Sequence, residues 1–196
     1  MIIAGVDEAG RGALAGPVVA GACVLNEEML SHPLIRDSKS LTPEQREEAF
    51  DWIKENCIFG IGSSDASKVD RDGILTSTES AMQKAVEQLA KKKKPSYLIV
   101  DGRDKFWFDY PHSAVIKGDT KEACISAASI IAKVTRDKLM IEYSCEFPNY
   151  GFEIHKGYGT ELHQKCILEH GPCSLHRQTF LKNLLTVSAS LAKSKV

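Results

Sequence analysis

Short apolar runs rich in β-branched residues recur along the chain, and this pattern predicts strands. The runs cover Ile2 to Val6, Val18 to Leu25, Ile58 to Gly62, Tyr97 to Val100 and Ala114 to Ile116. We therefore expect a sheet of five strands.

Three other segments carry apolar residues at helical spacing. The first is expected to begin at Thr42, which can cap a helix, and to continue with Pro43, which suits a first turn. The second is expected from about Leu75 to Lys92 and the third from about Thr120 to Tyr143. The early strands follow one another closely and helices separate the later ones, which predicts a mixed α/β sheet and not a purely alternating Rossmann pattern.

The pattern changes near Glu146, where glycine and proline become frequent before a last apolar stretch around Phe180 to Leu185. A chain of 196 residues with 43% hydrophobic content can bury a substantial core. We expect one main domain over residues 1–145 and a C-terminal appendage of loops and helix over residues 146–196, packed on that domain.

Charge and cysteine content limit the classes of function. The 25 basic residues nearly balance the 26 acidic ones, so any phosphate-binding surface must be local. The run Lys91 to Lys94 before Pro95 suits a helix C-terminus, with a nucleic-acid contact as the alternative. The six cysteines are scattered and form no C-x-x-C pair, which favours reduced thiols. With no basic leader and no long apolar segment, we expect a cytoplasmic protein without a membrane span.

Two adjacent carboxylates, Asp7 and Glu8, directly follow the first apolar run. Paired acids repel one another and are costly to desolvate, so this placement suggests a divalent cation that neutralises them. The turn Gly10-Arg11-Gly12 comes next and offers close main-chain approach and a forked cation for phosphate oxygens. Metal and phosphate together are the first hypothesis.

Two further acids stand at predicted strand ends. Asp101 follows Leu98-Ile99-Val100, and Asp119 follows Val115-Ile116-Lys117-Gly118. If these strands are neighbours, four acids at their ends can hold two hard cations about 3.5 to 4 Å apart, an arrangement that cleaves phosphodiesters.

Each acid also has a simpler explanation. Asp119 could be only a helix N-cap, and Asp101 with Gly102 only a turn. In a regular strand Asp7 and Glu8 point to opposite faces, so both can serve one site only if the chain twists or bulges near Ala9 and Gly10. Asp137 competes for the fourth position, but an unbroken helix would place it about 27 Å beyond Asp119. We therefore assign Asp119 to the site.

Seven blocks of this sequence, in order, resemble the bacterial type 2 ribonuclease H family, ribonuclease HII, along nearly the whole chain. The blocks are Asp7 to Gly12, Gly16 to Ala20, Asp37 to Lys39, Val100 to Gly102, Lys117 to Asp119, Ile125 to Val134 and His155 to Thr160. Gly171-Pro172, His176-Arg177 and Phe180 also look like the family, whereas Cys173 and Gln178 fall where its members vary.

The resemblance implies an RNase H-like fold, a five-stranded mixed sheet flanked by helices, with a helical C-terminal part. It also implies Mg²⁺- or Mn²⁺-dependent cleavage of the RNA strand in RNA–DNA hybrids. Nicking is expected 5′ of ribonucleotides embedded in duplex DNA, with 3′-hydroxyl and 5′-phosphate products. The four acids of the family map onto Asp7, Glu8, Asp101 and Asp119.

Only the 2′-hydroxyl distinguishes a ribonucleotide from its DNA neighbours, so some group must contact it. In family members a Gly-Arg-Gly turn and a tyrosine do so, which correspond here to Gly10, Arg11, Gly12 and Tyr158. A buried core tyrosine is the alternative for Tyr158. Ser38 and Lys39 are expected to bind a phosphate beside the scissile one, with an exposed surface lysine as the alternative.

Two rival functions stay open at this point. One is a nucleic-acid binding module without chemistry, which the intact set of four acids disfavours. The other is a different nuclease of the same fold, such as a DNA-junction resolvase. The chain shows no evident oligomerisation stripe, so we expect a monomer.

Overall fold

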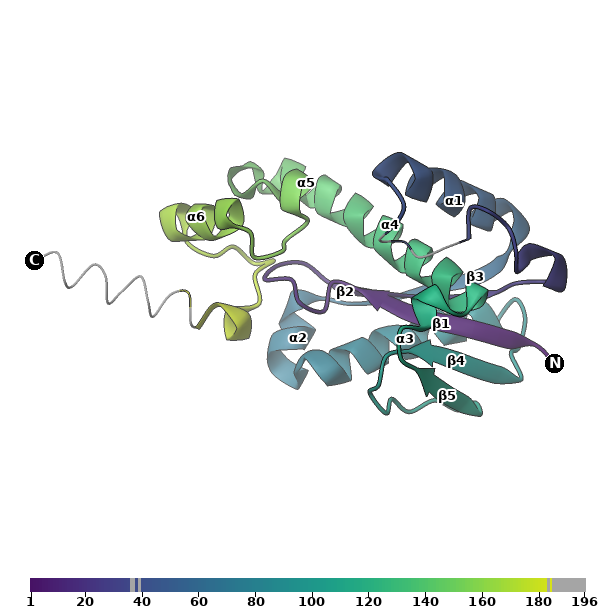
Figure 1. Ribbon diagram of the computed structural model, residues 1–196. Coiled ribbons are helices and arrows are strands. Elements are labelled where there is room, and N and C mark those ends of the chain that lie inside the picture. The colour runs from purple at the N-terminus through teal and green to yellow at the C-terminus, as the bar shows by residue number, and fades with distance from the viewer. Residues whose placement is uncertain (36–37, 39, 183, 185–196) are drawn as a thin grey trace, which may run out of the picture.

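Five strands form one mixed sheet in the computed structural model, which describes residues 1–35, 38, 40–182 and 184 (Figure 1). The strands are β1 (Ile3–Ala9), β2 (Val18–Val24), β3 (Ile58–Ser64), β4 (Tyr97–Asp101) and β5 (His112–Val115). Their order is β3-β2-β1-β4-β5. β2 is antiparallel to β1 and β3, whereas β4 is parallel to β1 and β5. The predicted mixed sheet is confirmed.

The first strand is longer than its apolar run. β1 continues through Asp7 and Glu8 to Ala9, and these three residues stay in register with β2. Pairing with β4 ends at Val6 and Val100. The predicted position of the two acids after the strand is therefore wrong. They lie inside β1, on the part that extends beyond its pairing with β4.

Helices cover both faces of this sheet (Figure 1). On one face lie α1 (Pro43–Asn56) and α4 (Ala123–Glu146), whose buried residues form one core with Cys23 of β2. On the other face lie α2 (Ala66–Asp72) and α3 (Ile74–Ala90), in a second core with Ala4 of β1. None of the helices in the described part of the chain is long and apolar enough to cross a membrane.

The helix starts follow local chemistry. Thr42 caps α1 as predicted, because its hydroxyl accepts the Gln45 N–H at 3.3 Å and the Gln45 side chain accepts the Thr42 N–H at 3.0 Å. The third predicted helix begins later than expected. A 3₁₀ turn over Gly118–Thr120 precedes α4, and Glu122 occupies the N-cap position of that helix. The interpretation of Asp119 as the N-cap is therefore wrong.

Two glycines let α4 lie directly on the sheet. A Cβ atom at Gly5 of β1 would stand 2.2 Å from the carbonyl carbon of Cys124, and one at Gly21 of β2 would stand 2.4 Å from the carbonyl oxygen of Ala128. Real Cβ atoms do not approach so closely. The absence of side chains at these positions fixes the height of α4 over β1.

The C-terminal part contains the short elements η3 (Pro148–Tyr150), α5 (Phe152–His155) and α6 (Glu161–His170), and helix resumes at Gln178. A further 3₁₀ turn, η1, covers Glu27–Met29. This part joins the loop after β1 through main-chain hydrogen bonds. Leu14 N–H donates to Gly157 O at 2.8 Å, and Arg177 N–H donates to Leu14 O at 2.8 Å. The segments around residues 157 and 177 therefore lie against the start of the site.

Candidate active site

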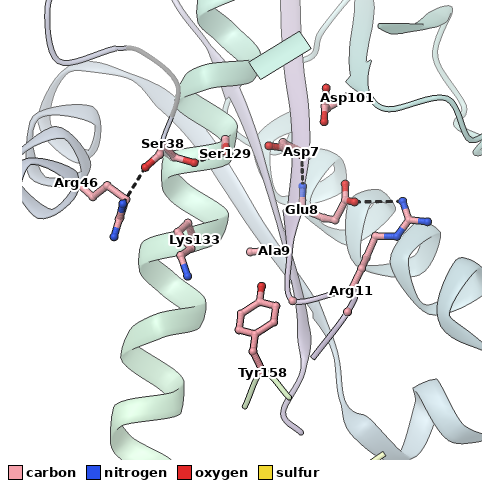
Figure 2. A pocket seen from close by; sticks show the side chains of 12 residues that line it. Asp7, Glu8, Ala9, Arg11, Ser38, Arg46, Asp101, Ser129, Lys133 and Tyr158 are labelled. Atoms are coloured by element: carbon pink, nitrogen blue, oxygen red, sulfur yellow. Dashed lines mark hydrogen bonds and ion pairs between the residues drawn. The ribbon is translucent and has the colours of Figure 1, made fainter. Parts of the chain in front are cut away.

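A cavity of about 430 Å³ opens where β1 extends beyond β4 (Figure 2). It contains eight of the ten site residues predicted from the sequence, and Arg46, Ser129 and Lys133 in addition. Its lining is Asp7, Glu8, Ala9, Gly10, Arg11, Gly12, Ser38, Arg46, Asp101, Ser129, Lys133 and Tyr158. Residues from five widely separated parts of the chain thus meet around one space.

The strand register explains why the acids converge. Val6 and Val100 are the last paired residues of β1 and β4, so Asp7 and Asp101 each stand one position farther along parallel neighbouring strands. No bulge is needed to bring in Glu8, because Glu8 pairs regularly with Ala20 of β2. Its side chain lines the cavity around the exposed edge of β1 (Figure 2).

The predicted fourth acid, Asp119, does not line this cavity. It is 4% exposed, and its carbonyl oxygen accepts the Ser126 hydroxyl at 2.7 Å. Its neighbour Gly118 donates its N–H to Asp101 Oδ1 at 2.6 Å, so the turn that carries Asp119 is tied to the acid end of the site. Asp137 lies apart from this cavity and pairs with Lys133 at 2.9 Å. Lys39 lies outside the described residues.

The carboxylates are held at an electrostatic cost. Burial raises the pKa of Asp7 well above its usual value, and the charges of Glu8 and Asp101 raise it further. Burial likewise raises the pKa of Glu8, against the opposing effect of Arg11. Arg11 bridges Glu8 at 3.2 Å and Asp104 at 2.8 Å.

An oxygen-only set of crowded carboxylates suits hard divalent cations. As the side chains stand, no group of three or more His, Cys, Asp or Glu residues within the described ranges converges closely enough to hold an ion. The donor chemistry and the raised pKa of Asp7 fit a cation, whose charge would favour the ionised acids.

The turn after β1 uses its two glycines differently. Gly10 has φ +91°, and a Cβ atom there would stand 2.0 Å from Nε of Arg136, so the fold itself requires glycine. Gly12 is exposed, and a Cβ atom there would meet nothing within 4 Å. The free protein does not require glycine at that position, which leaves room for close approach by a ligand.

Arg177 fixes this turn through hydrogen bonds to its main-chain carbonyl groups. The side chain is fully buried, and its guanidinium donates to the carbonyl oxygens of Gly10 at 2.8 Å, Arg11 at 2.9 Å and Gly16 at 2.8 Å. Sequence reasoning placed Arg177 in a family block but gave it no role. Its partners are main-chain atoms more than 160 positions away, and no local pattern indicates such contacts.

Arg136 of α4 links the same loop to the segment of Tyr158. It is fully buried and donates to Pro17 O at 2.9 Å, Ala15 O at 3.0 Å and Lys156 O at 2.8 Å. These contacts give Arg136 a structural role. Arg177 and Arg136 thus hold the Gly10-Arg11-Gly12 turn and the segment of Tyr158, the two groups predicted to contact the ribose.

Tyr158 is half-buried, and its phenol points into the cavity toward Ala9 and Glu8 (Figure 2). Its ring packs beside two cations, with Arg136 Cζ at 5.2 Å and Lys133 Nζ at 5.7 Å from the ring centroid. The alternative of a buried core tyrosine is therefore wrong.

The opposite wall of the cavity is basic. Arg46 of α1 donates through Nη1 to Ser38 O at 2.8 Å and Leu41 O at 2.6 Å, and the Ser38 hydroxyl bonds that of Ser129 at 2.8 Å. Sequence reasoning missed Arg46, although one signal existed. A cation in the first turns of a helix opposes the helix dipole, which suggests that another contact selects it.

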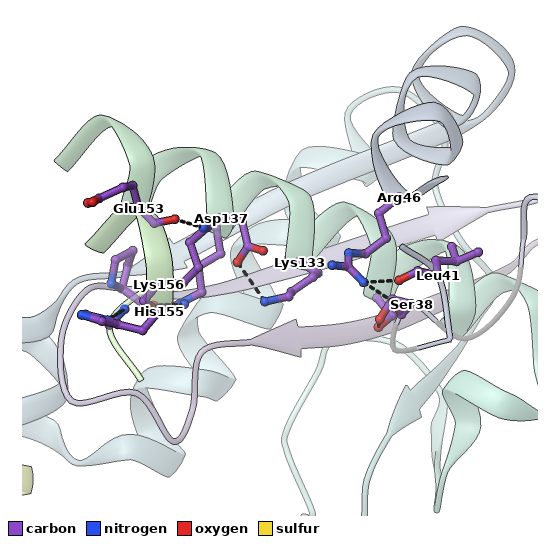
Figure 3. A network of polar contacts seen from close by, with 12 residues as sticks. Ser38, Leu41, Arg46, Lys133, Asp137, Glu153, His155 and Lys156 are labelled. Atoms are coloured by element: carbon purple, nitrogen blue, oxygen red, sulfur yellow. Dashed lines mark hydrogen bonds and ion pairs between the residues drawn. The ribbon is translucent and has the colours of Figure 1, made fainter. Parts of the chain in front are cut away.

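A second cavity of about 480 Å³ continues from the first between α1, α4 and α5, and Arg46, Lys133 and Tyr158 line both. Figure 3 shows the polar contacts along this stretch, from Ser38 and Arg46 across Lys133 to Lys156. The two cavities together offer a continuous path for an extended ligand.

Comparison with known proteins identifies close relatives. The family model described as Ribonuclease HII matches residues 4–183. The ribonuclease HII of Geotalea uraniireducens is 49% identical over 179 residues, which cover 91% of this chain and 82% of that protein. The ribonuclease HII of Caldicellulosiruptor saccharolyticus is 46% identical over 184 residues, which cover 93% of this chain and 88% of that protein.

Solved structures share the fold. The ribonuclease H2 of Pyrococcus horikoshii has a TM-score of 0.73 at 26% identity and covers 94% of this chain and 97% of that one. The chain from the PCNA:RNase HII complex of Archaeoglobus fulgidus has a TM-score of 0.75 at 24% identity, with 91% and 94% covered. Bst-RNase HIII, solved with Mn²⁺, has a TM-score of 0.72 at 18% identity, with 95% and 70% covered.

Proposed function

Because the chain belongs to the ribonuclease HII family, we propose that it nicks duplex DNA on the 5′ side of embedded ribonucleotides, in the cavity lined by Asp7, Asp101 and Tyr158. It is a ribonuclease H, a hydrolase that cleaves the RNA strand of RNA–DNA hybrids. Membership of this family implies dependence on a divalent metal ion. The proposal concerns the site, the ion and the single-ribonucleotide substrate.

The observation that carries the proposal is the shared cavity. Crowded carboxylates at one end face a tyrosine and a glycine turn at the other (Figure 2). Acids alone are compatible with any metal-dependent nuclease. A phenol and main-chain groups within the same space add contacts for a sugar hydroxyl, which a nuclease that acts only on DNA does not need.

We propose Mg²⁺ or Mn²⁺ as the ion, held by Asp7, Glu8 and Asp101. Asp119 is proposed as a further ligand, because the turn that carries it is hydrogen-bonded to Asp101. When bound, such ions supply Lewis acidity, which strengthens water as a nucleophile and offsets charge on the leaving oxygen. The Mn²⁺ in the Bst-RNase HIII structure supports this choice.

The protein groups orient the substrate in this proposal. Gly10, Arg11 and Gly12 approach the ribose from the main chain, and the Tyr158 phenol bonds its 2′-hydroxyl. Ser38, with Lys39, binds the neighbouring phosphate, and the cavity adds Arg46 and Lys133 as cations for the same strand. Direct attack by water leaves a 3′-hydroxyl and a 5′-phosphate.

The test is a nicking assay on a duplex with one ribonucleotide, in Mg²⁺, in Mn²⁺ and in chelator. We expect cleavage with either ion and none with chelator. Asp101→Asn should lower the rate by on the order of 100-fold or more while duplex binding stays measurable. Asp109→Asn, at an exposed loop position, is the matched control and should stay within about 2-fold of wild type.

Other outcomes identify the rivals. Near-normal nicking by Asp101→Asn would remove that residue from the mechanism. Duplex binding without cleavage in either metal would support a binding module. Cleavage of branched all-DNA substrates in preference to the ribonucleotide duplex would support a resolvase.

A further inference from the structure

Three buried histidines lie beneath Tyr158, and the mechanism proposed above uses none of them. They are His155 of α5, His163 of α6 and His176 near the C-terminal end, with 7%, 0% and 2% of their surfaces exposed. Histidine is costly to bury unless its ring nitrogens find partners. Each of these rings therefore needs a hydrogen-bond partner at its nitrogens.

One set of contacts runs from Cys173 to Tyr158. The Cys173 main-chain N–H donates to His176 Nδ1 at 2.9 Å. His176 Nε2 lies 3.1 Å from His163 Nε2, and His163 Nδ1 lies 3.0 Å from the carbonyl oxygen of Tyr158. We call these four residues the histidine relay.

The partners at the two ends determine where each proton lies. A carbonyl oxygen only accepts, so His163 Nδ1 must carry a proton, and in a neutral ring its Nε2 then accepts. At the other end an amide N–H only donates, so His176 Nδ1 accepts and its Nε2 carries the proton. The shared contact is then an N–H of His176 that donates to His163.

This assignment gives each of the three contacts one donor and one acceptor, and the Cys173 thiol, 3.1 Å from His176 Nδ1, can donate to the same nitrogen. Reversing it would direct a lone pair at the Tyr158 carbonyl and an N–H at the Cys173 amide. Protonating His163 would place two N–H groups face to face at 3.1 Å, and protonating His176 would turn an N–H toward the Cys173 amide at 2.9 Å. The relay is complete only when both imidazoles are neutral.

The surroundings favour that neutral state. His155 accepts the Gly157 N–H through Nδ1 at 3.1 Å and bonds Tyr150 O through Nε2 at 2.7 Å, and its ring stacks on His163 with centroids 4.2 Å apart. Phe152 packs edge-on against His163. Burial, together with the charge of a protonated His155, lowers the pKa of His163 and of His176 to about 4.

We propose that His163 and His176 are positioning residues for Tyr158, which hold its main chain so that the phenol reaches the ribose. This inference rests on the proposed function and adds a mechanism for its selectivity.

The segment before Tyr158 gives a reason for such a tether. Lys156 has φ +52° and Gly157 has φ +81°, two successive left-handed positions of which the first is unusual for a residue with a side chain. After this turn, the Tyr158 carbonyl accepts the Thr160 N–H at 2.8 Å, a local bond across two residues. The His163 bond adds an anchor to α6.

A direct test is the tautomeric state of each ring, read from ¹⁵N chemical shifts and long-range couplings of histidine-labelled protein at pH 7. We expect His163 as the Nδ1–H tautomer, and His155 and His176 as Nε2–H tautomers. A protonated His163, or His163 as the Nε2–H tautomer, would overturn the relay. This readout does not depend on nuclease activity.

The functional test is a double-mutant cycle on the single-ribonucleotide duplex. His163→Leu should lower nicking by about 10-fold, whereas His163→Asn, whose amide can donate in place of Nδ1–H, should recover to within about 3-fold of wild type. In a Tyr158→Ala background, His163→Leu should cost less than about 2-fold more, because the side chain that it positions is gone. Losses that multiply in the double mutant would overturn the positioning role.

Controls separate folding and the proposed function from this inference. Cys145→Ala, at an exposed position of α4 outside the relay, should stay within about 2-fold of wild type. Thermal unfolding checks that each variant is folded at the assay temperature. If His163→Leu is unfolded there, the activity of His163→Asn and the tautomeric states of the wild-type histidines test the positioning role instead. Wild-type protein that fails to nick refutes the proposed function and leaves the tautomer result standing.

Discussion

Nη2 of Arg177 lies 2.8 Å from the carbonyl oxygen of Gly10, although 167 positions separate the two residues. The guanidinium is fully buried and its partners are main-chain carbonyls. Burial lowers the pKa of Arg177 to about 10, which still leaves it charged at neutral pH. A cation thus fixes the turn proposed to contact the ribose to the C-terminal part of the chain.

Arg177→Met should destabilise the protein by about 3 kcal/mol, because buried carbonyl oxygens lose their donors. Urea denaturation measures the free energy of unfolding of the variant against wild type. Arg103→Met, at an exposed position, is the control and should change that free energy by less than about 0.5 kcal/mol. Equal effects of the two substitutions would contradict the role of Arg177.

The two glycines of the turn should separate stability from activity. Gly10→Ala forces a Cβ atom against Arg136 at φ +91° and should cost about 2 kcal/mol or more of stability. Gly12→Ala meets no atom in the free protein, so its stability should stay within about 0.5 kcal/mol while nicking of the ribonucleotide duplex falls. Denaturation and nicking assays on both variants check this; unchanged nicking by Gly12→Ala would remove that residue from the contact.

Removal of the Tyr158 phenol should affect substrate choice. Tyr158→Phe keeps the ring beside Arg136 and Lys133 but loses the hydroxyl, and nicking at a single ribonucleotide should fall by about 10-fold. Cleavage of a continuous RNA–DNA hybrid should fall less, since it offers several positions for attack. The ratio of the two rates in Tyr158→Phe and Tyr158→Ala is the measurement, and an unchanged ratio would contradict the assignment.

The buried histidines predict a pH dependence of stability. In the folded protein the pKa of His163 and of His176 is lowered from 6.5 to about 4, so the unfolded chain binds more protons between these values. Their contribution is fully present above about pH 6.5 and is lost as the pH falls toward 4. Burial also lowers the pKa of His155, which adds in the same direction, with Glu153 and Lys156 as its charged neighbours.

Urea denaturation of wild type and His163→Leu at several pH values between 7 and 4 measures this contribution. The difference in unfolding free energy between the two should shrink as the pH falls, because the variant has one fewer imidazole to protonate. Comparing the two proteins cancels the opposing contribution of the acids in the cavity. A difference that stays constant would show that His163 titrates normally.

Much of the fold was predictable because its signals are local. The five apolar runs correspond to the five strands in the described part of the chain, and Thr42 with Pro43 marks the start of α1. The end of β1 was missed because apolar periodicity stops at Val6, whereas pairing with β2 carries charged residues onward to Ala9. β5 begins two residues earlier than predicted, at the polar residue His112.

The candidate site was predictable only in part, for a physical reason. Acids at strand ends and a glycine turn are visible in the sequence, because strand register and turn geometry depend on neighbouring residues. Arg177 binds main-chain carbonyls more than 160 positions away, and Arg46 and His163 bind carbonyls of the loops that precede their helices. A carbonyl group is the same in every residue, so the sequence gives no indication of which one a distant side chain will bind.

The contact of α4 with Gly5 has a consequence for how the enzyme can fail. One end of this helix lies by Asp7, through Ser129, and farther along it Lys133 and Arg136 flank Tyr158. Because the backbone of α4 contacts the backbone of β1 at Gly5, a larger residue at that position can be accommodated only if the whole helix moves away from the sheet. Such a displacement would move Lys133, Arg136 and the neighbouring Tyr158 away from the acids of β1 and β4, so damage at this strand should weaken cleavage and the preference for ribose together.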